Sequence, residues 1–214
     1  MKKLLSIEKY KFSIYDEITS IIFNDESVKN NIVREITDDS FAIIDSRTVD
    51  SNVKVSDFLK ANNFDMKLVN KYNIRDYLGT NLLDLKVEDQ LYLKIIVIIN
   101  YVNDRNFVFD DVLSYLSEDR KKIIFKTIFD KNVKYYNFTS DIEEVVYSNY
   151  LIVLSKDGVA VEGTVKSVLG EEKLLKRLGF SLPVIYDISL QLKSYGLIDK
   201  PYVDMKKLVN DLWK

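Results

Sequence analysis

The fold is decided by three stretches in the second half of the chain: RNFVFDD at 105–111, NFTSDIEEVVYSNYLIVL at 137–154 and KDGVAVEGT at 156–164. The first two each contain a short apolar strand that ends in polar residues, Asp110-Asp111 and Thr139-Ser140-Asp141. In the third stretch, Asp157-Gly158 predicts a hairpin turn between two strands. Helical patterns lie between the strands, and such alternation predicts a mostly parallel α/β sheet.

The rest of the chain also alternates between short strands and helices. A hairpin and a core strand are predicted over 4–23, followed by a polar loop and a short helix. Apolar periodicity then predicts a strand at 41–44, two or three short helices over 55–83, and a strongly apolar helix at 87–102.

Several helices carry recognisable start and stop signals. Ser117 is expected to cap a helix at 118–130 that buries Ile123, Ile124, Ile128 and Phe129. In the tail, four further helices are predicted from Thr164, Pro183 and Asp204 as start signals and from two glycines as stop signals. The predicted tail helices are 165–169, 171–178, 184–195 and 205–213.

The composition excludes several kinds of chemistry. The 214 residues suit one domain with a small extension, and 47% are apolar, which is enough for a sizeable core. The chain contains no cysteine and no histidine, which excludes disulfides, zinc–thiolate sites and Ser-His mechanisms. The net charge of −2 and the pI of about 5.4 give no overall basic field for nucleic acid.

Neither a signal peptide nor a membrane span is expected. The N-terminal segment MKKLLSIEKYKF has positive charge but lacks the apolar region of a signal peptide. The longest apolar run, at 91–102, is too short for a bilayer and carries Lys94, so a buried helix is the better interpretation. We therefore expect a soluble, cytoplasmic protein.

In their order, these elements resemble the ATP-binding-cassette (ABC) ATPases, in particular the ATPases of energy-coupling-factor (ECF) transporters. The segment 140–164 is similar to the part of the family that starts with the switch histidine. The stretches EGTVKSVL at 162–169, LLKRLGFSLPVIYDISLQLKSYGLI at 174–198 and MKKLVNDLW at 205–213 resemble the short C-terminal extension of the ECF subgroup. The likeness covers about 105–214 well and the first half of the chain less closely.

The resemblance implies a P-loop NTPase fold, in which helices flank a mostly parallel sheet. On this basis residues 1–165 form an ABC ATPase-like core, and 37–103 within it form a reduced helical arm region. Residues 166–214 form a helical C-terminal extension. The chain between Lys29 and Lys86 is too short for the full arm and Q-loop of a working member.

The phosphate-binding loop of the family aligns with FNDESVKNN at 23–31. Such a loop needs glycines, because its backbone N–H groups turn inward around the phosphates, and a lysine that reaches the terminal phosphates. Ser27 and Lys29 match the pattern, and Asn30 stands where the family places its magnesium-binding serine or threonine. The three glycine positions hold Phe23, Glu26 and Val28.

The other nucleotide motifs of the family survive only in fragments. Asp110 matches the aspartate on the magnesium side, and Asp111 stands where the family has its catalytic glutamate. Of the signature sequence, aligned with KVEDQ at 86–90, only Gln90 is kept. Ser140 stands at the position of the switch histidine, and no glutamine precedes position 90 to form a Q-loop. The degraded motifs predict that ATP hydrolysis has been lost.

We therefore expect a catalytically inactive ABC ATPase-like protein, a pseudo-ATPase, that acts as a protein-binding or regulatory subunit. The resemblance implies a homo- or heterodimer with an ABC or ECF ATPase-like chain, and a peripheral association with a membrane complex. No metal site and no firmly bound cofactor are expected; ATP with magnesium would bind only weakly.

Two alternatives stay open. Catalytically inactive relatives of these ATPases also bind DNA ends in CRISPR spacer acquisition, and a stripe of lysines around the helix at 118–130 fits that role, whereas the acidic pI does not. The other alternative is an ATP sensor that binds without hydrolysis through Lys29, Asn30 and Asp110. The lysines of the stripe are Lys121, Lys122, Lys126, Lys131 and Lys134.

Overall fold

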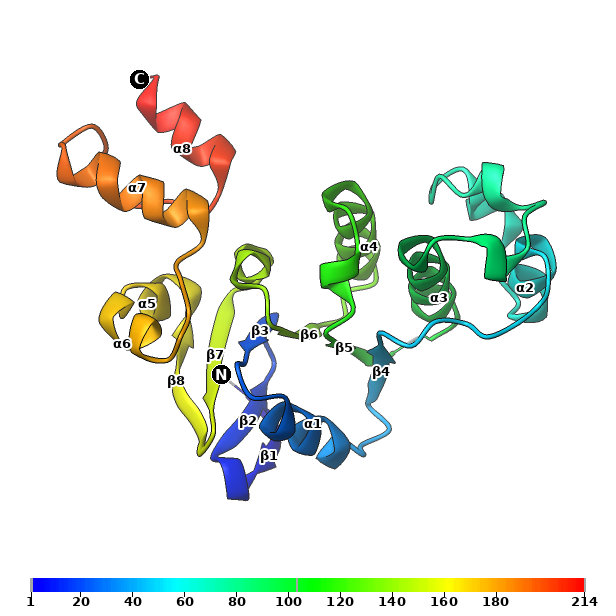
Figure 1. The fold of residues 1–214 in the computed structure, drawn as a ribbon, viewed down its shortest axis with the longest axis horizontal. Coiled ribbons are helices and arrows are strands. Elements are labelled where there is room, and N and C mark those ends of the chain that lie inside the picture. Colours follow the sequence, from blue (N-terminus) through cyan, green and yellow to red (C-terminus); the bar gives the residue numbers. More distant parts are fainter. Residues whose placement is uncertain (1, 103, 214) are drawn as a thin grey trace. The chain divides into compact units, whose positions relative to one another are not determined.

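The computed structural model describes residues 2–102 and 104–213. The chain divides into two compact units: the first combines residues 1–35 with 138–214, and the second spans 36–137. The main sheet has the strand order β4-β5-β6-β3-β7-β8 (Figure 1). β6 (Tyr135–Thr139) contains the boundary between the two units. The expected architecture, a mostly parallel sheet flanked by helices, is confirmed.

The first unit contains a separate hairpin and one side of the main sheet. β1 (Lys3–Ile7) and β2 (Phe12–Tyr15) pair in antiparallel fashion. β3 (Thr19–Ile22) pairs in parallel with β7 (Tyr150–Ser155), and β7 pairs with β8 (Gly158–Thr164) as an antiparallel hairpin. All four residues of β3 are buried, as expected for an inner strand of an α/β sheet.

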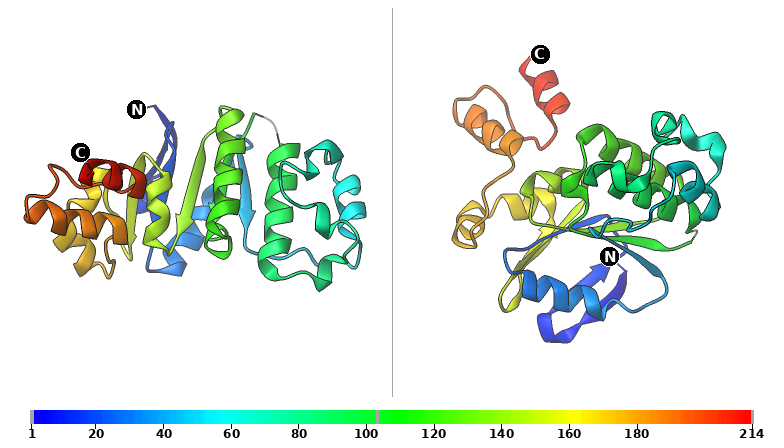
Figure 2. Two further views of the ribbon diagram at one scale, coloured as in Figure 1. Left: turned by 90° about the horizontal axis from the view of Figure 1, so that it is seen from above. Right: turned by 45° about the vertical axis from the view of Figure 1, so that its right-hand side comes forward.

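Short helices cover this part of the sheet (Figure 2). Ile22 and Val153 of the strands share one apolar core with Leu169, Leu175 and Tyr186 of the C-terminal helices, so the tail is packed onto the unit. The helices of the unit are α1 (Glu26–Glu35), α5 (Val165–Leu169), α6 (Glu172–Arg177), α7 (Val184–Ser194), α8 (Met205–Leu212), and the 3-10 turns η1 (Glu8–Tyr10) and η6 (Ile142–Tyr147).

The second unit is mostly helical. β4 (Phe41–Asp45) pairs in parallel with β5 (Asn106–Asp110). The α-helices are α2 (Val55–Ala61), α3 (Val87–Tyr101) and α4 (Glu118–Asp130), and α3 and α4 lie side by side (Figures 1 and 2). Four 3-10 turns complete the unit: η2 (Met66–Val69), η3 (Arg75–Tyr77), η4 (Leu82–Asp84) and η5 (Leu113–Tyr115).

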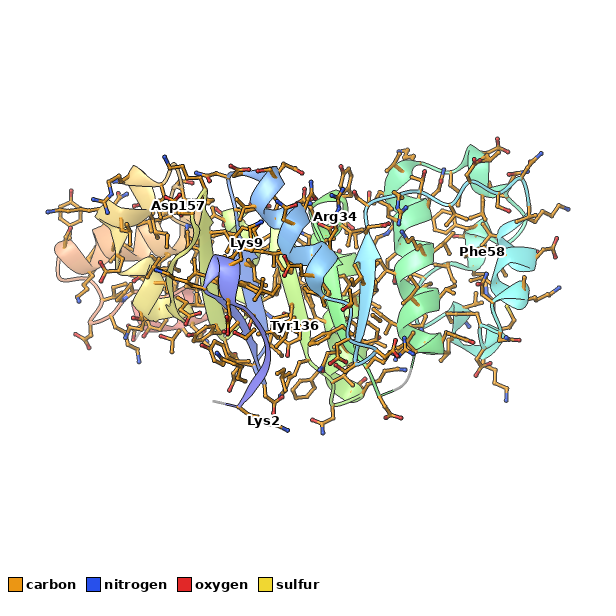
Figure 3. All side chains as sticks on the ribbon, turned by 90° about the horizontal axis from the view of Figure 1, so that it is seen from below. Lys2, Lys9, Arg34, Phe58, Tyr136 and Asp157 are labelled. Carbon is orange, nitrogen blue, oxygen red and sulfur yellow. The ribbon has the colours of Figure 1, made fainter. Side chains whose placement is uncertain are left out.

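Aromatic and aliphatic side chains fill the core of the second unit (Figure 3). Tyr136 of β6 is fully buried, and its ring meets that of Phe41 edge-on at 5.7 Å between centroids. α3 buries Leu91, Ile95 and Ile99, which confirms the expectation of a core helix. Within the described residues, none of the helices has both the length and the apolar character needed to cross a membrane.

Local signals in the sequence located most element ends correctly. Thr164 and Asp204 cap α5 and α8 as predicted: the Thr164 side chain accepts a hydrogen bond from the N–H of Ser167, and that of Asp204 accepts one from the N–H of Lys207. Region 55–83 contains one α-helix and three 3-10 turns, since its short apolar groups support only single turns.

Two predictions for the helix after residue 117 are wrong. Ser117 stands at the N-cap of α4, but its side chain makes no capping hydrogen bond. Its backbone N–H instead donates to Oε1 of Glu88 at 3.0 Å, so a side chain from α3 takes part at this helix start. Phe129 is 76% exposed, because it is turned away from the face of α4 that buries Ile124 and Ile128.

Candidate functional site

The stretch that aligns with the phosphate loop forms an ordinary helix start. Only residues 23–25 form a loop, because α1 begins at Glu26 and the remaining residues of the stretch are helical. None of residues 23–31, all of them described, has a positive φ. A loop that curls its amide groups around phosphates depends on such backbone conformations, which glycine adopts most easily. The backbone of this stretch therefore does not form a phosphate cradle.

Asp25 closes the N-terminus of α1 with its own carboxylate. Its Oδ1 atom accepts hydrogen bonds from the Ser27 hydroxyl at 2.6 Å, from the Ser27 N–H at 2.8 Å and from the Val28 N–H at 3.4 Å. These bonds, with that of the Ser27 hydroxyl the strongest, lower the pKa of Asp25. Free N–H groups at a helix N-terminus attract phosphates. Here a carboxylate of the chain itself is the anion that these groups hold.

Lys29 is folded back against its own helix and is almost completely buried. Its Nζ atom lies 3.7 Å from Oε2 of Glu26, and it lies over the ring of Phe23 at 5.3 Å from the centroid. Phe23 and Glu26 both stand where the family has glycine. The residues that replace the glycines therefore also hold the lysine that would reach a phosphate, whereas Asn30 is half-buried on the same helix.

The loop is also bonded to the C-terminal extension. The Nδ2 atom of Asn24 donates a hydrogen bond to the carbonyl oxygen of Leu178, just after α6, at 2.5 Å. A cavity of about 430 Å³ lies beside this contact. Charged side chains of both signs line it, so it does not favour a highly charged anion: Asp25, Asp157, Lys156 and Arg177.

At the end of β5 lie Asp110 and Asp111, which stand where the family has its magnesium-side aspartate and its catalytic glutamate. Asp110 is in register with Asp45 of the neighbouring strand β4. Asp111 has a φ of 51°, in the left-handed region that residues other than glycine seldom adopt. Among the described residues, no group of three or more His, Cys, Asp or Glu side chains is arranged to hold a metal ion.

Asp45, which the sequence reasoning missed, belongs to an ion cluster. Nζ of Lys94 donates to Asp45 Oδ1 at 2.5 Å and to the carbonyl oxygens of Asp45 and Arg47 at 3.0 and 2.9 Å. Burial opposes ionisation of Asp45, but the hydrogen bonds from Arg47 and Lys94 outweigh it and lower its pKa to about 2. The carboxylate of Asp45 is thus committed to these cations. The sequence offered one signal for this cluster: Lys94 interrupts an otherwise apolar helix, and a buried lysine needs an acidic or carbonyl partner.

The start of α3, aligned with the signature sequence, is occupied by structural contacts. Nε2 of Gln90 donates to the carbonyl oxygen of Leu85 at 3.0 Å, and the side chain is buried. Glu88 and Asp89, which replace the glycines of the signature, both form ion pairs with Arg120 of α4. The acidic replacements therefore join α3 to α4, a role that the sequence alone did not reveal.

The predicted site residues fall into both units. Ser27, Lys29 and Asn30 lie on α1 of the first unit, and Ser140 is exposed directly after β6 in the same unit. Gln90, Asp110 and Asp111 belong to the second unit. Within the first unit, the structure places Ser27 and Lys29 in the first turns of α1, directly after Asp25.

The lysine stripe of α4 is interrupted. Lys121 is buried, and its Nζ atom lies 3.4 Å from Oε1 of Glu118. Lys122 pairs with Asp119 at 3.3 Å. These pairs reduce the positive charge that the stripe could present to a nucleic acid.

Comparisons of sequence and of structure both find ATP-binding proteins of ABC transporters. No family model matches the chain. Its relatives include the energy-coupling factor transporter ATP-binding protein EcfA1 of Lactobacillus delbrueckii, 25% identical over 118 residues, which are 53% of this chain and 42% of that protein. EcfA1 of Mycoplasmopsis synoviae is 28% identical over 111 residues, 50% of this chain and 40% of its own. The alignments thus span about two fifths of these curated relatives.

Solved structures show the same fold. The ATP-binding subunit of an ABC transporter matches with a TM-score of 0.64 at 10% identity, over 79% of this chain and 90% of that one. CbiO1 of Clostridium perfringens, part of the ABC transporter complex cbiONQ, matches with a TM-score of 0.58 at 13% identity, over 87% and 89% of the two chains. The chain therefore has the fold of an ABC ATPase and is homologous, over about half its length, to ECF transporter ATP-binding proteins.

Proposed function

We propose that this protein is a non-catalytic member of the ABC ATPase fold that works as a protein-binding or regulatory subunit. The observation that carries the proposal is the start of α1, where the Asp25 carboxylate accepts the hydrogen bonds of Ser27 and Val28. A nucleotide phosphate at this helix start would have to displace a carboxylate of the chain. The negative charges of the phosphate and of the Asp25 carboxylate would repel one another at this helix start.

The environment of Lys29 supports the same conclusion. To reach a phosphate, its ammonium group would have to leave Glu26 and the face of the Phe23 ring, and its buried stem would become exposed. Val28 adds a further obstacle, because a β-branched residue stands where the family uses glycine to bring the backbone close to phosphate. Restoring the site would therefore require several simultaneous changes.

A protein-binding role fits what the fold still offers. Each unit exposes large apolar side chains that a partner chain could cover, among them Val184, Tyr195 and Trp213 in the first unit and Tyr115 and Phe129 in the second. We infer a partner chain of the same fold, either a second copy or an active homologue, and a peripheral place on a membrane transporter complex. CbiO1, a structural neighbour, is itself part of a transporter complex.

The loss of catalysis is tested by magnesium-dependent ATP turnover of the purified protein. We expect no turnover above the level of a Lys29→Ala variant. Clear turnover that disappears in Lys29→Ala would contradict the proposal, because it would show that the buried lysine still serves the reaction.

The partner is tested separately by light scattering and by co-expression with the ABC-type ATP-binding proteins of the same organism. We expect the chain to be recovered in a complex of defined stoichiometry with itself or with one of them. A monomer that co-purifies with none of them would contradict the subunit role, whatever the outcome of the turnover assay.

A further inference from the structure

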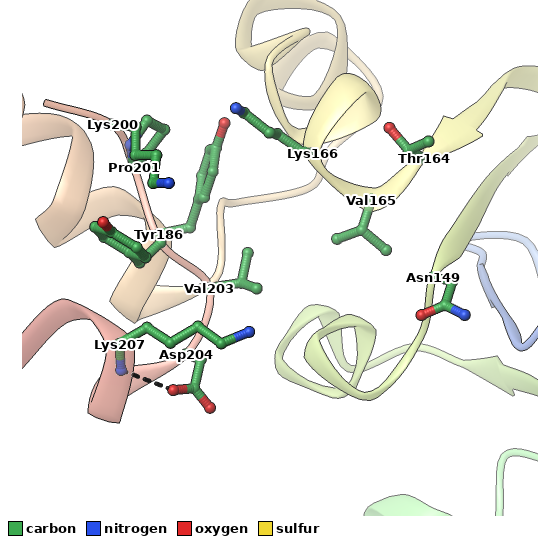
Figure 4. A pocket seen from close by; sticks show the side chains of 11 residues that line it. Asn149, Thr164, Val165, Lys166, Tyr186, Lys200, Pro201, Val203, Asp204 and Lys207 are labelled. Carbon is green, nitrogen blue, oxygen red and sulfur yellow. Dashed lines mark hydrogen bonds between the residues drawn. The ribbon is translucent and has the colours of Figure 1, made fainter. Parts of the chain in front are cut away.

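A cavity of about 400 Å³ lies in the first unit, where the C-terminal helices meet α5 (Figure 4). Its volume is within the range of small-molecule sites. The cavity is separate from the start of α1, since none of residues 23–31 lines it. It therefore does not belong to the former nucleotide site.

The inner wall of the cavity is apolar and aromatic. Tyr186 of α7 and Val165 of α5 are almost completely buried. Pro201, Tyr202 and Val203, from the segment that leads into α8, are half-buried and complete this wall. An apolar wall of this kind favours the body of an aromatic or aliphatic ligand, because the contact removes apolar surface from water.

The rim is cationic. Lys166 of α5, Lys200 of the segment before α8, and Lys207 of α8 all line the cavity and are exposed. Figure 4 shows the side chains of Lys166 and Lys207 reaching toward it from two different helices. Among the described residues, neither of these two lysines forms an ion pair, whereas Lys200 lies 5.7 Å from the centroid of the Tyr202 ring.

Asp204 lines the cavity, and Glu17 and Asp211 bond to residues that line it; Asp211 accepts a hydrogen bond from the Tyr202 hydroxyl at 3.0 Å. The Oδ1 atom of Asp204 accepts the N–H of Lys207 at 2.9 Å as the cap of α8. Glu17 accepts a hydrogen bond from Asn149 at 3.3 Å. The residues that line the cavity therefore include three lysines and one carboxylate, so the lining itself has excess positive charge.

We propose that this cavity binds a small organic anion, with its apolar body against Tyr186 and its phosphate or carboxylate group between Lys166 and Lys207. The ligand would connect α5 to α8 and so fix the end of the C-terminal extension. The proposal does not depend on the loss of ATP hydrolysis, because no residue of α1 takes part in it.

The test is calorimetric titration of the full chain with 1-naphthyl phosphate, an aromatic probe with a dianionic group. Inorganic phosphate and uncharged 1-naphthol are titrated in parallel. We expect saturable binding of naphthyl phosphate that weakens as salt is added, and weaker binding of both controls, because only the probe combines the two features that the cavity offers.

Variants locate the site. The double variant Lys166→Gln, Lys207→Gln is expected to weaken binding by roughly fivefold to tenfold, as two exposed ion pairs are lost. Lys173→Gln on α6 removes an exposed lysine outside the cavity and serves as the control, with the affinity expected within about twofold of the original. Absence of saturable binding, equal binding of 1-naphthol, or an unchanged affinity of the double variant would each overturn the proposal.

Discussion

Two helices of the first unit, α1 and α8, begin in the same way and differ in the lysine beside the cap. Asp25 accepts the N–H of Ser27 at 2.8 Å, and Asp204 accepts the N–H of Lys207 at 2.9 Å. Lys29 of α1 is buried against Phe23 and Glu26, whereas Lys207 is exposed at the rim of a cavity. An aspartate cap is thus common to both helices, and the two helix starts differ in the lysine, which is buried at α1 and exposed at α8.

The largest loss of stability is expected at Asp45, a carboxylate bonded to two cations. The aspartate caps of α1 and α8 bond only to neutral groups, so their removal should cost less. Asp45→Asn removes the charge that Lys94 and Arg47 stabilise, and should lower the free energy of unfolding at pH 7 by about 2 kcal/mol. Urea denaturation of both proteins measures this difference. Because the pKa of Asp45 is lowered by folding, the difference should be complete above about pH 4 and vanish as the pH falls to about 2. A difference that does not depend on pH would rule out the charge as its cause.

The two lysines should respond differently to truncation. Lys29→Ala removes a buried aliphatic stem and its contacts with Phe23 and Glu26, and should cost about 1–2 kcal/mol of stability. Lys207→Ala removes an exposed side chain and should change stability by less than about 0.5 kcal/mol. Urea denaturation is again the measurement. Equal effects would show that Lys29 is not held as described.

Removing either aspartate cap should destabilise the protein by the same amount, and by less than the changes at Asp45 and Lys29. Asp25→Ala and Asp204→Ala should each lower Tm by about 2–4 °C, since each leaves helix N–H groups without an acceptor. Asp39→Ala, an exposed aspartate outside any helix, is the control and should leave Tm unchanged. Thermal unfolding followed by circular dichroism decides. A cap effect at α8 but none at α1 would break the comparison.

Much of the architecture could be predicted from local signals. The apolar runs at 41–44 and 107–110 and the helix at 87–102 are strong patterns, and Thr164 and Asp204 are correct caps, because these features depend on residues close in sequence. The exposure of Phe129 was not predicted, because polarity is a poor guide to burial in α4. Two polar residues, Lys121 and Thr127, lie on its buried face, whereas the apolar Phe129 is exposed.

The candidate site was less accessible to sequence reasoning. Alignment showed which glycines were lost but not what the replacements do. The contact of Asn24 with Leu178 joins residues far apart in the chain, as does the pairing of Glu88 and Asp89 with Arg120. Such contacts depend on tertiary packing. The Asp25 cap, by contrast, could have been predicted, since an aspartate directly before a helix is a common start signal.

The most direct test of the account is calorimetric titration of the purified protein with magnesium-ATP, with Lys29→Ala in parallel. If Asp25 and the buried Lys29 close the start of α1, neither protein should show saturable heat up to millimolar ATP. Micromolar binding that is abolished in Lys29→Ala would contradict this. It would mean that the helix start opens to hold a phosphate, and it would favour the alternative of an ATP sensor.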